Sequence, residues 1–327
     1  MKHFYSSTII LIIGLIIAYY LGGFAGVYIA GLLALLEVSL SFDNAVVNAK
    51  ILSTMDEIWQ KRFITWGMII AVFGMRFLFP ILIVMIVGGL GLIDTLNIAL
   101  NDPEKYHHIL KANENLIFAF GGSFLLMVFF DFFFEEREIK WLKFIEDNKV
   151  TNSLSKVPNT GLILATIVGI VLTYETKSYE VAIAFYMGML IHSLLASVDD
   201  LFDSDVVKNG LIGFIYLEVL DASFSFDGVI GAFALSQNIF LIMIGLGIGA
   251  MFVRSLTLYL VEKGTLSEYR YLEHGAHYAI VVLAVIMLLK IFFHISEEIT
   301  GTIGIALIGV AFWHSYLANK KEDSNIA

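Results

Sequence analysis

Apolar segments long enough to cross a lipid bilayer dominate this sequence, and they leave few folds open. The first extends from Ile9 to Leu36 without a charged residue. A helix needs about 20 apolar residues to span the hydrocarbon core, and within lipid only helices and closed barrels satisfy their backbone hydrogen bonds. Hydrophobic residues make up 58% of the chain and charged residues only 15%, whereas roughly a quarter of the residues in soluble domains are charged. We therefore predict an all-α polytopic membrane protein.

The hydropathy pattern predicts about ten transmembrane helices. The first apolar segment is too long for one crossing, and we divide it at Gly22-Gly23. The fifth predicted span is short, and whether it crosses fully is left open. The predicted spans are 5–21, 25–47, 63–87, 116–134, 160–174, 180–197, 211–235, 239–261, 277–293 and 299–318.

The distribution of basic residues predicts the orientation. Loops on the cytoplasmic side of a membrane are enriched in Lys and Arg. With the N-terminus inside, only Lys105, Lys111 and Lys177 fall in outer loops, and most other basic residues fall in inner segments. We expect an integral protein of the plasma (bacterial inner) membrane with both termini cytoplasmic.

Charge and cysteine content exclude several classes of function. The net charge is −10 and the isoelectric point about 5.2, so nucleic acid is not an expected partner because its phosphates would be repelled. The chain has no cysteine, which excludes disulfides, thiolate nucleophiles and zinc–thiolate sites. The expected partners are the lipid bilayer and a metal ion, and a homo-oligomer is left open.

Two predicted spans share a polar motif, which indicates an internal repeat. The second span contains Glu37-Val-Ser39-Leu-Ser41-Phe42-Asp43-Asn44, and the seventh contains Asp221-Ala-Ser223-Phe-Ser225-Phe226-Asp227-Gly228, preceded by Glu218. The following span carries one arginine in each case, Arg76 and Arg254. Because the matched spans are five apart, they cross in opposite directions. An inverted repeat of this kind is typical of secondary transporters, whose sites lie near mid-membrane at the repeat interface.

The repeat also predicts the organisation of the chain. The segments are an N-terminal transmembrane helix (1–24), a first repeat (25–134), a cytoplasmic amphipathic linker (135–160), two connecting helices with an acidic loop (161–210), a second repeat (211–295), and a last helix with a cytoplasmic tail (296–327).

Carboxylates inside apolar spans are costly, at about 2.5–3.5 kcal/mol each on insertion scales. Five are placed there: Glu37, Asp43, Glu218, Asp221 and Asp227. The simplest interpretation is ion pairing with Arg76, Arg254 and Lys290, with Asp131 near the inner end of its own span. Five acids against three bases leave two negative charges over. One divalent cation or two protons would neutralise them.

Helical periodicity groups part of the polar set on one face. Glu37, Ser41, Asn44 and Asn48 share that face, and Asp43 lies off it. Asp43 and its counterpart Asp227 join the same site only if the helix is locally unwound or both faces line a cavity.

The donor atoms in the motif favour a hard metal ion. Carboxylate, amide and hydroxyl oxygens suit Mg²⁺, Ca²⁺ and Mn²⁺. We expect a transported ion with no permanently bound cofactor. The predicted metal ligands are Glu37, Asp43, Asn44, Glu218, Asp221 and Asp227, with Ser41, Ser225 and Asn48 as accessory polar groups.

At these residues the chain resembles the TerC family of integral membrane proteins, within the LysE-type transporter superfamily. The likeness extends from about residue 25 to 295 and rests on Glu37-Val-Ser-Leu-Ser41-Phe-Asp43-Asn44 and on Glu218-Val-Leu-Asp221…Phe226-Asp227. Gly228 and Ser225 depart from that family's pattern, which indicates a divergent branch. The resemblance implies metal-ion homeostasis, since several members are linked to manganese export and others are named for tellurite resistance.

The leading hypothesis is a secondary exporter of a hard divalent cation, with manganese favoured, in exchange for protons. The alternatives are an exporter of a small organic solute such as an amino acid, and a membrane assembly or stress-resistance protein without transport activity. An aspartyl protease dyad of Asp43 and Asp227 is disfavoured, because the Gly-x-Gly-Asp arrangement of intramembrane proteases is absent. We do not expect an enzyme.

Overall fold

The computed structural model describes residues 4–78, 81–82, 84–85, 89–201, 210–221, 232, 236, 238–263, 269–295 and 297–326. Every regular element in these ranges is helical, which confirms the predicted all-α class. Five of the described helices are long and apolar enough to cross a membrane. They are Tyr5–Val38, Glu114–Phe134, Ile239–Glu262, Leu272–Lys290 and Thr302–Lys320, and the shorter apolar helices are Thr160–Thr176 and Tyr179–Leu194.

Helix α1 (Tyr5–Leu40) is a hairpin of two helical halves. The chain bends at Gly22 and Gly23, where Gly23 has φ +60°, a conformation that side chains rarely adopt. The halves lie so close that a Cβ at Gly26 would stand 2.4 Å from the carbonyl oxygen of Ala18. The predicted division of the first apolar segment at these glycines is confirmed.

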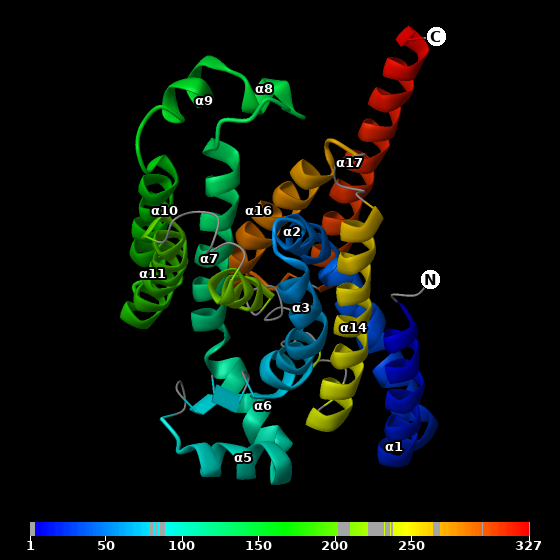
Figure 1. Ribbon diagram of the computed structural model, residues 1–327. Coiled ribbons are helices and arrows are strands. Elements are labelled where there is room, and N and C mark those ends of the chain that lie inside the picture. Colours follow the sequence, from blue (N-terminus) through cyan, green and yellow to red (C-terminus); the bar gives the residue numbers. More distant parts are fainter. Residues whose placement is uncertain are drawn as a thin grey trace.

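Both halves of α1 pack against α14 (Ile239–Lys263), at the right of Figure 1. The Ser7 hydroxyl donates to the Met251 carbonyl at 2.9 Å. The second half of α1 passes close to two glycines of α14, because a Cβ at Gly245 or Gly249 would lie 2.4–2.5 Å from atoms of that half. Small residues four apart allow this approach.

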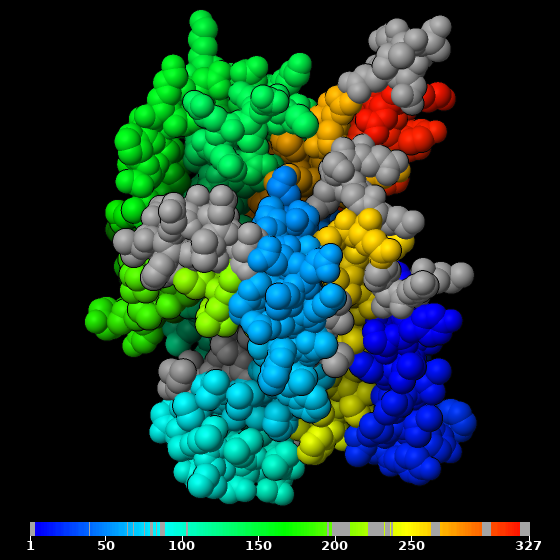
Figure 2. Space-filling model, in the orientation of Figure 1, coloured from blue at the N-terminus to red at the C-terminus, as the bar shows by residue number. Residues whose placement is uncertain are grey.

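A break at Ser41 (φ −106°, ψ 17°) separates α1 from α2 (Phe42–Ser53). Next come α3 (Glu57–Ile69) and the π-helix η2 (Ile70–Leu78). The predicted spans 25–47 and 63–87 therefore consist of pieces rather than straight helices. Figure 2 shows α2 and α3 on one face of the molecule, beside α14.

Helix α7 (Glu114–Phe134) connects the two ends of the molecule. At one end lie α5 (Leu92–Asn101) and α6 (Pro103–Ala112), and at the other lie α8 (Lys143–Glu146) and α9 (Lys149–Leu154).

Around α7 pack α10 (Thr160–Thr176), α11 (Tyr179–Leu201) and α16 (Leu272–Lys290). Helix α16 is antiparallel to α7, because Lys290 lies over the Phe118 ring while His277 stacks on Phe132. Helix α17 (Glu297–Ile326) lies along α16 on its other side.

The linker between the halves folds onto the protein through Trp141. Its Nε1 donates to His314 Nδ1 at 2.9 Å, and its ring meets that of Tyr278 edge-on. The hydrogen bond to α17 satisfies the indole N–H of this half-buried tryptophan.

Replacing Gly245 by Ala should destabilise the protein. The added Cβ would lie 2.5 Å from Leu33 Cβ and 2.9 Å from the backbone oxygen of Ala30. The backbone of α1 would have to shift to relieve this overlap. Overpacking of this kind costs about 1–3 kcal/mol. Thermal unfolding in detergent should therefore shift downward by several degrees. Gly31→Ala is the matched control, because no atom lies within 4 Å of its added Cβ, and equal shifts in both variants would contradict the packing account.

Candidate functional site

The site is organised around Arg76, a residue of η2 that is only 2% exposed. Its Nη1 donates to Asp221 Oδ2 at 3.0 Å and to the Ala71 carbonyl at 2.9 Å. Its Nη2 donates to Glu37 Oε1. One guanidinium thus joins acids from the two copies of the polar motif.

The second arginine, Arg254, lies on α14 and pairs with Glu218. Nη2 is 3.1 Å from both carboxylate oxygens of Glu218 and 3.8 Å from Asp221 Oδ2. From α3, the Phe63 carbonyl accepts from Nη1 at 3.0 Å, and the Phe63 ring centroid lies 4.2 Å from the guanidinium carbon. The prediction that both arginines contact acids of the repeat helices is confirmed.

Close packing against Gly67 holds the Arg254–Glu218 pair in place. A Cβ at Gly67 would lie 2.3 Å from Arg254 Nη1 and 2.6 Å from Glu218 Oε1. The absence of a side chain on this turn of α3 therefore makes room for the ion pair.

The start of α2 supplies the remaining polar groups of the first motif. Asn44 Nδ2 donates to Asp221 Oδ1 at 2.7 Å, and Ser41 Oγ donates to Glu37 Oε1 at 3.1 Å. Asp43 is buried and accepts from the backbone N–H of Asn44 at 2.9 Å. It lies in the first turn of α2, where the helix dipole favours negative charge. The helix is locally broken at Ser41, which is one of the two arrangements we considered, but no ion pair joins Asp43 to either arginine among the described residues.

Three buried oxygen atoms in this region accept no hydrogen bond from a described residue. They are Glu37 Oε2, Asn44 Oδ1 and Asn48 Oδ1. Leaving a buried acceptor unsatisfied costs about 1–3 kcal/mol, and more for a charged group. These oxygens are therefore available to a proton donor or to a cation.

The charges of the site do not balance. The carboxylates of Glu37, Glu218 and Asp221 contact the two guanidinium groups, whereas Asp43 is buried without an ion pair to either of them. All six residues are at most 5% exposed. If every acid is ionised, four negative charges oppose two positive ones. Within the described residues, however, no three His, Asp or Glu side chains are arranged to hold a metal ion.

The other predicted residues lie elsewhere or outside the described ranges. Asp227 and Ser225 of the second motif belong to the residues that the structure does not describe. Asp131 Oδ2 lies 3.3 Å from His192 Nε2, whereas Lys290 lies over Phe118. Phe118 and Asp131 are 13 residues apart on α7, about 20 Å along its axis, so Asp131 and Lys290 do not pair with each other.

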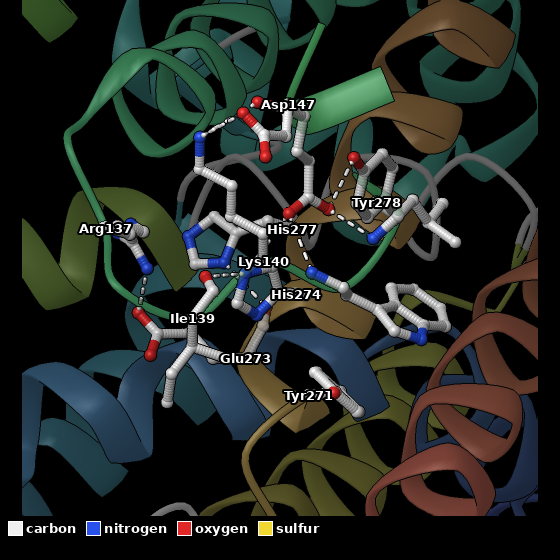
Figure 3. Close-up of polar contacts among 12 residues, drawn as sticks. Arg137, Ile139, Lys140, Asp147, Tyr271, Glu273, His274, His277 and Tyr278 are labelled. Carbon is white, nitrogen blue, oxygen red and sulfur yellow. Dashed lines mark hydrogen bonds and ion pairs between the residues drawn. The ribbon is translucent and has the colours of Figure 1, made fainter. Parts of the chain in front are cut away.

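Glu273, which we did not single out from the sequence, also binds two basic side chains. Its Oε1 accepts from Arg137 at 2.9 Å (Figure 3), and its Oε2 lies 3.1 Å from Lys50 Nζ. No local pattern predicts this contact, because the three residues come from distant parts of the chain.

Removing the charge of Arg254 alone should be more harmful than removing the whole pair. Arg254→Gln leaves Glu218 buried without its partner, and breaking a buried pair costs about 3–5 kcal/mol. Arg254→Gln combined with Glu218→Gln removes both charges and should recover much of the loss.

The measurement is the yield of monodisperse protein together with its thermal unfolding midpoint, for both single variants and the double variant. Additive losses in the double variant would show that the two side chains do not depend on each other.

The comparisons with known proteins bear on the family alone. A family model described as "Protein of unknown function (DUF475)" matches residues 42–322. Comparison with curated proteins and with solved structures found no match. The matched region begins at α2 and includes both arginines, Glu218 and Asp221. Because the match covers most of the sequence, the chain belongs to the DUF475 family.

Proposed function

We propose that this protein is a secondary transporter that exports a hard divalent cation, with Mn²⁺ as the first ion to test. The observation that carries the proposal is a buried group of four carboxylates, three of which contact the two guanidiniums. Beside them, the amide oxygens of Asn44 and Asn48 accept no hydrogen bond from a described residue. An excess of buried negative charge is costly in lipid, and such residues commonly mark ion pathways.

The arginines explain how the acids are tolerated without an ion. Arg76 and Arg254 neutralise part of the charge of Glu37, Glu218 and Asp221. Asp43 has no ion pair with a described residue. We propose that an arriving cation binds at Asp43 and the free oxygens of Asn44 and its neighbours, and displaces guanidinium contacts as it does so. Asp227 of the second motif would complete the ligand set.

Exchange for protons follows from the crowding of carboxylates. Acids that share a site cannot all ionise unless a cation is present, so some would carry protons in the ion-free state. Binding of a divalent cation would release those protons. The sequence carries no Walker motif for nucleotide binding, so an ion gradient is the energy source that fits.

The packing directions support ten crossings and an inverted repeat. The two halves of α1 lie in opposite directions along α14, since Ser7 bonds Met251 while Gly245 and Gly249 lie against Ala30 and Glu37 in turn. This hairpin of 34 mostly apolar residues has the length of two short spans. The antiparallel pairing of α7 with α16 also fits spans four and nine, which alternate crossings orient oppositely.

The resemblance to TerC proteins supports manganese as the cargo. The candidate ligands among the described residues of the cluster are carboxylate and amide oxygen atoms, which suit Mn²⁺, Mg²⁺ and Ca²⁺.

Asp43→Asn should reduce Mn²⁺ flux into reconstituted vesicles by about tenfold or more, since even outer-shell partners of metal ligands are worth that much. Because Asp43 takes no part in the ion pairs of either arginine among the described residues, this variant leaves the arginine network intact and should fold normally. Asp227→Asn should behave in the same way.

The matched control is Glu57→Gln, whose carboxylate is exposed and pairs with Lys61 on the same helix. Flux should be measured for Mn²⁺, Mg²⁺, Ca²⁺ and Zn²⁺, and for radiolabelled amino acids. Wild-type flux in both aspartate variants, or flux of an amino acid without any cation, would reject the proposal.

A further inference from the structure

We name the buried acids and the two arginines that contact them the acid site. A bridge of three charged side chains joins the linker to α2, the helix that contributes Asp43 and Asn44 to this site. Glu273, in the first turn of α16, binds Arg137 of the linker through Oε1 at 2.9 Å and Lys50 of α2 through Oε2 at 3.1 Å. Lys50 lies in the last turn of α2. It is six residues beyond Asn44, about 9 Å along the helix axis.

Arg137 is itself fixed on several sides. Its Nη2 donates to Glu135 at 2.5 Å, and its guanidinium carbon lies 3.8 Å from the centroid of the Phe132 ring. Phe132 in turn stacks on His277 of α16, with ring centroids 3.7 Å apart. The linker arm of the bridge therefore cannot move without disturbing the end of α7.

A second set of contacts holds residues 135–146, which we name the strap, across the end of α16 (Figure 3). The carboxylate of Glu146 accepts from the backbone N–H groups of Trp141 and Leu142 at 2.8 and 3.0 Å, and from the Tyr278 hydroxyl at 2.9 Å. His274 Nε2 lies 3.1 Å from the Ile139 carbonyl oxygen. The strap thus crosses from the first half of the chain onto the second.

A cavity of about 580 Å³ lies under the strap, in the size range of small-ligand sites. Its lining includes Glu135, Arg137, Glu146, Lys156 and His274. The cavity shares Arg137 with the bridge, so the bridge borders a hollow that water and ions can enter.

We propose that the Lys50–Glu273–Arg137 bridge is a gate, which holds α2 against the strap and closes the acid site from the linker end. It is the one contact among the described residues in which a single side chain joins α2, the linker and α16. Opening would separate Lys50 or Arg137 from Glu273 and connect the cavity with the buried face of α2. This inference rests on the proposed function for what passes the gate, but the gate can be tested without any ion.

The absence of native cysteine allows a direct test of access. Asn48→Cys places a thiol on a side chain that is 2% exposed, between the acid site and the bridge. Val150→Cys, at a 68% exposed position in α9, identifies the linker side of oriented vesicles. In each orientation, the labelling rate of Asn48→Cys by a membrane-impermeant thiol reagent is then measured with and without Glu273→Gln.

Glu273→Gln should raise the labelling rate from the linker side by about tenfold or more, because charge-assisted hydrogen bonds to both partners are weakened. The rate from the opposite side should not change. Lys50→Gln and Arg137→Gln, each cutting one arm, should give smaller increases with the same sidedness. Lys61→Gln, which removes an exposed pair at the surface, should leave the rate unchanged.

An unchanged rate in all three bridge variants, or an equal increase from both sides, would overturn the gate. If Glu273→Gln fails to accumulate in the membrane, the two single-arm variants decide. Faster labelling from the linker side, together with no cation flux in reconstituted vesicles, would leave the gate standing and reject the proposed cargo. Cation flux in the wild-type protein, together with unchanged labelling in all the bridge variants, would reject the gate and leave the proposed cargo standing.

Discussion

The contact of Arg76 with Glu37 and Asp221 is the interaction on which the centre of this structure depends. A guanidinium buried at 2% exposure is stable in an apolar protein only if acids surround it, and those acids come from α1 and from residues 211–221. The pairing therefore fixes two distant parts of the chain against η2. Asp221 lies between Arg76 and Arg254, so the second pair is linked to the first through one carboxylate.

Glycines at the helix contacts provide the space that this arrangement needs. Gly249 of α14 lies against the side chain of Glu37, and Gly67 of α3 lies against the Arg254–Glu218 pair. At both places a methyl group would occupy the volume that a charged side chain fills. The glycines thus have a role beyond general packing, because each allows an ion pair to lie between two helix backbones.

Much of the fold could be predicted from the sequence, because apolar periodicity and a pair of glycines are local signals. They predicted the helical class, the bend at Gly22-Gly23 and the pairing of buried arginines with buried acids. What could not be predicted depends on long-range docking. No local pattern shows that Asp221 lies between two arginines, or that Glu273 binds Lys50 and Arg137. Because the first residues of α16 include polar side chains, we predicted that this span starts at residue 277, whereas the helix begins at Leu272. The second motif beyond Asp221 stays a prediction.

The π-helix at Ile70–Leu78 determines the direction in which Arg76 points. Hydrogen bonds of a π-helix join residues five apart rather than four, so this segment contains more residues per turn than the α-helix preceding it. Arg76 lies near the end of the segment and therefore points in a different direction about the helix axis than it would if α3 continued as an α-helix. The aim of this guanidinium at Glu37 and Asp221 is thus encoded in the backbone winding that precedes it.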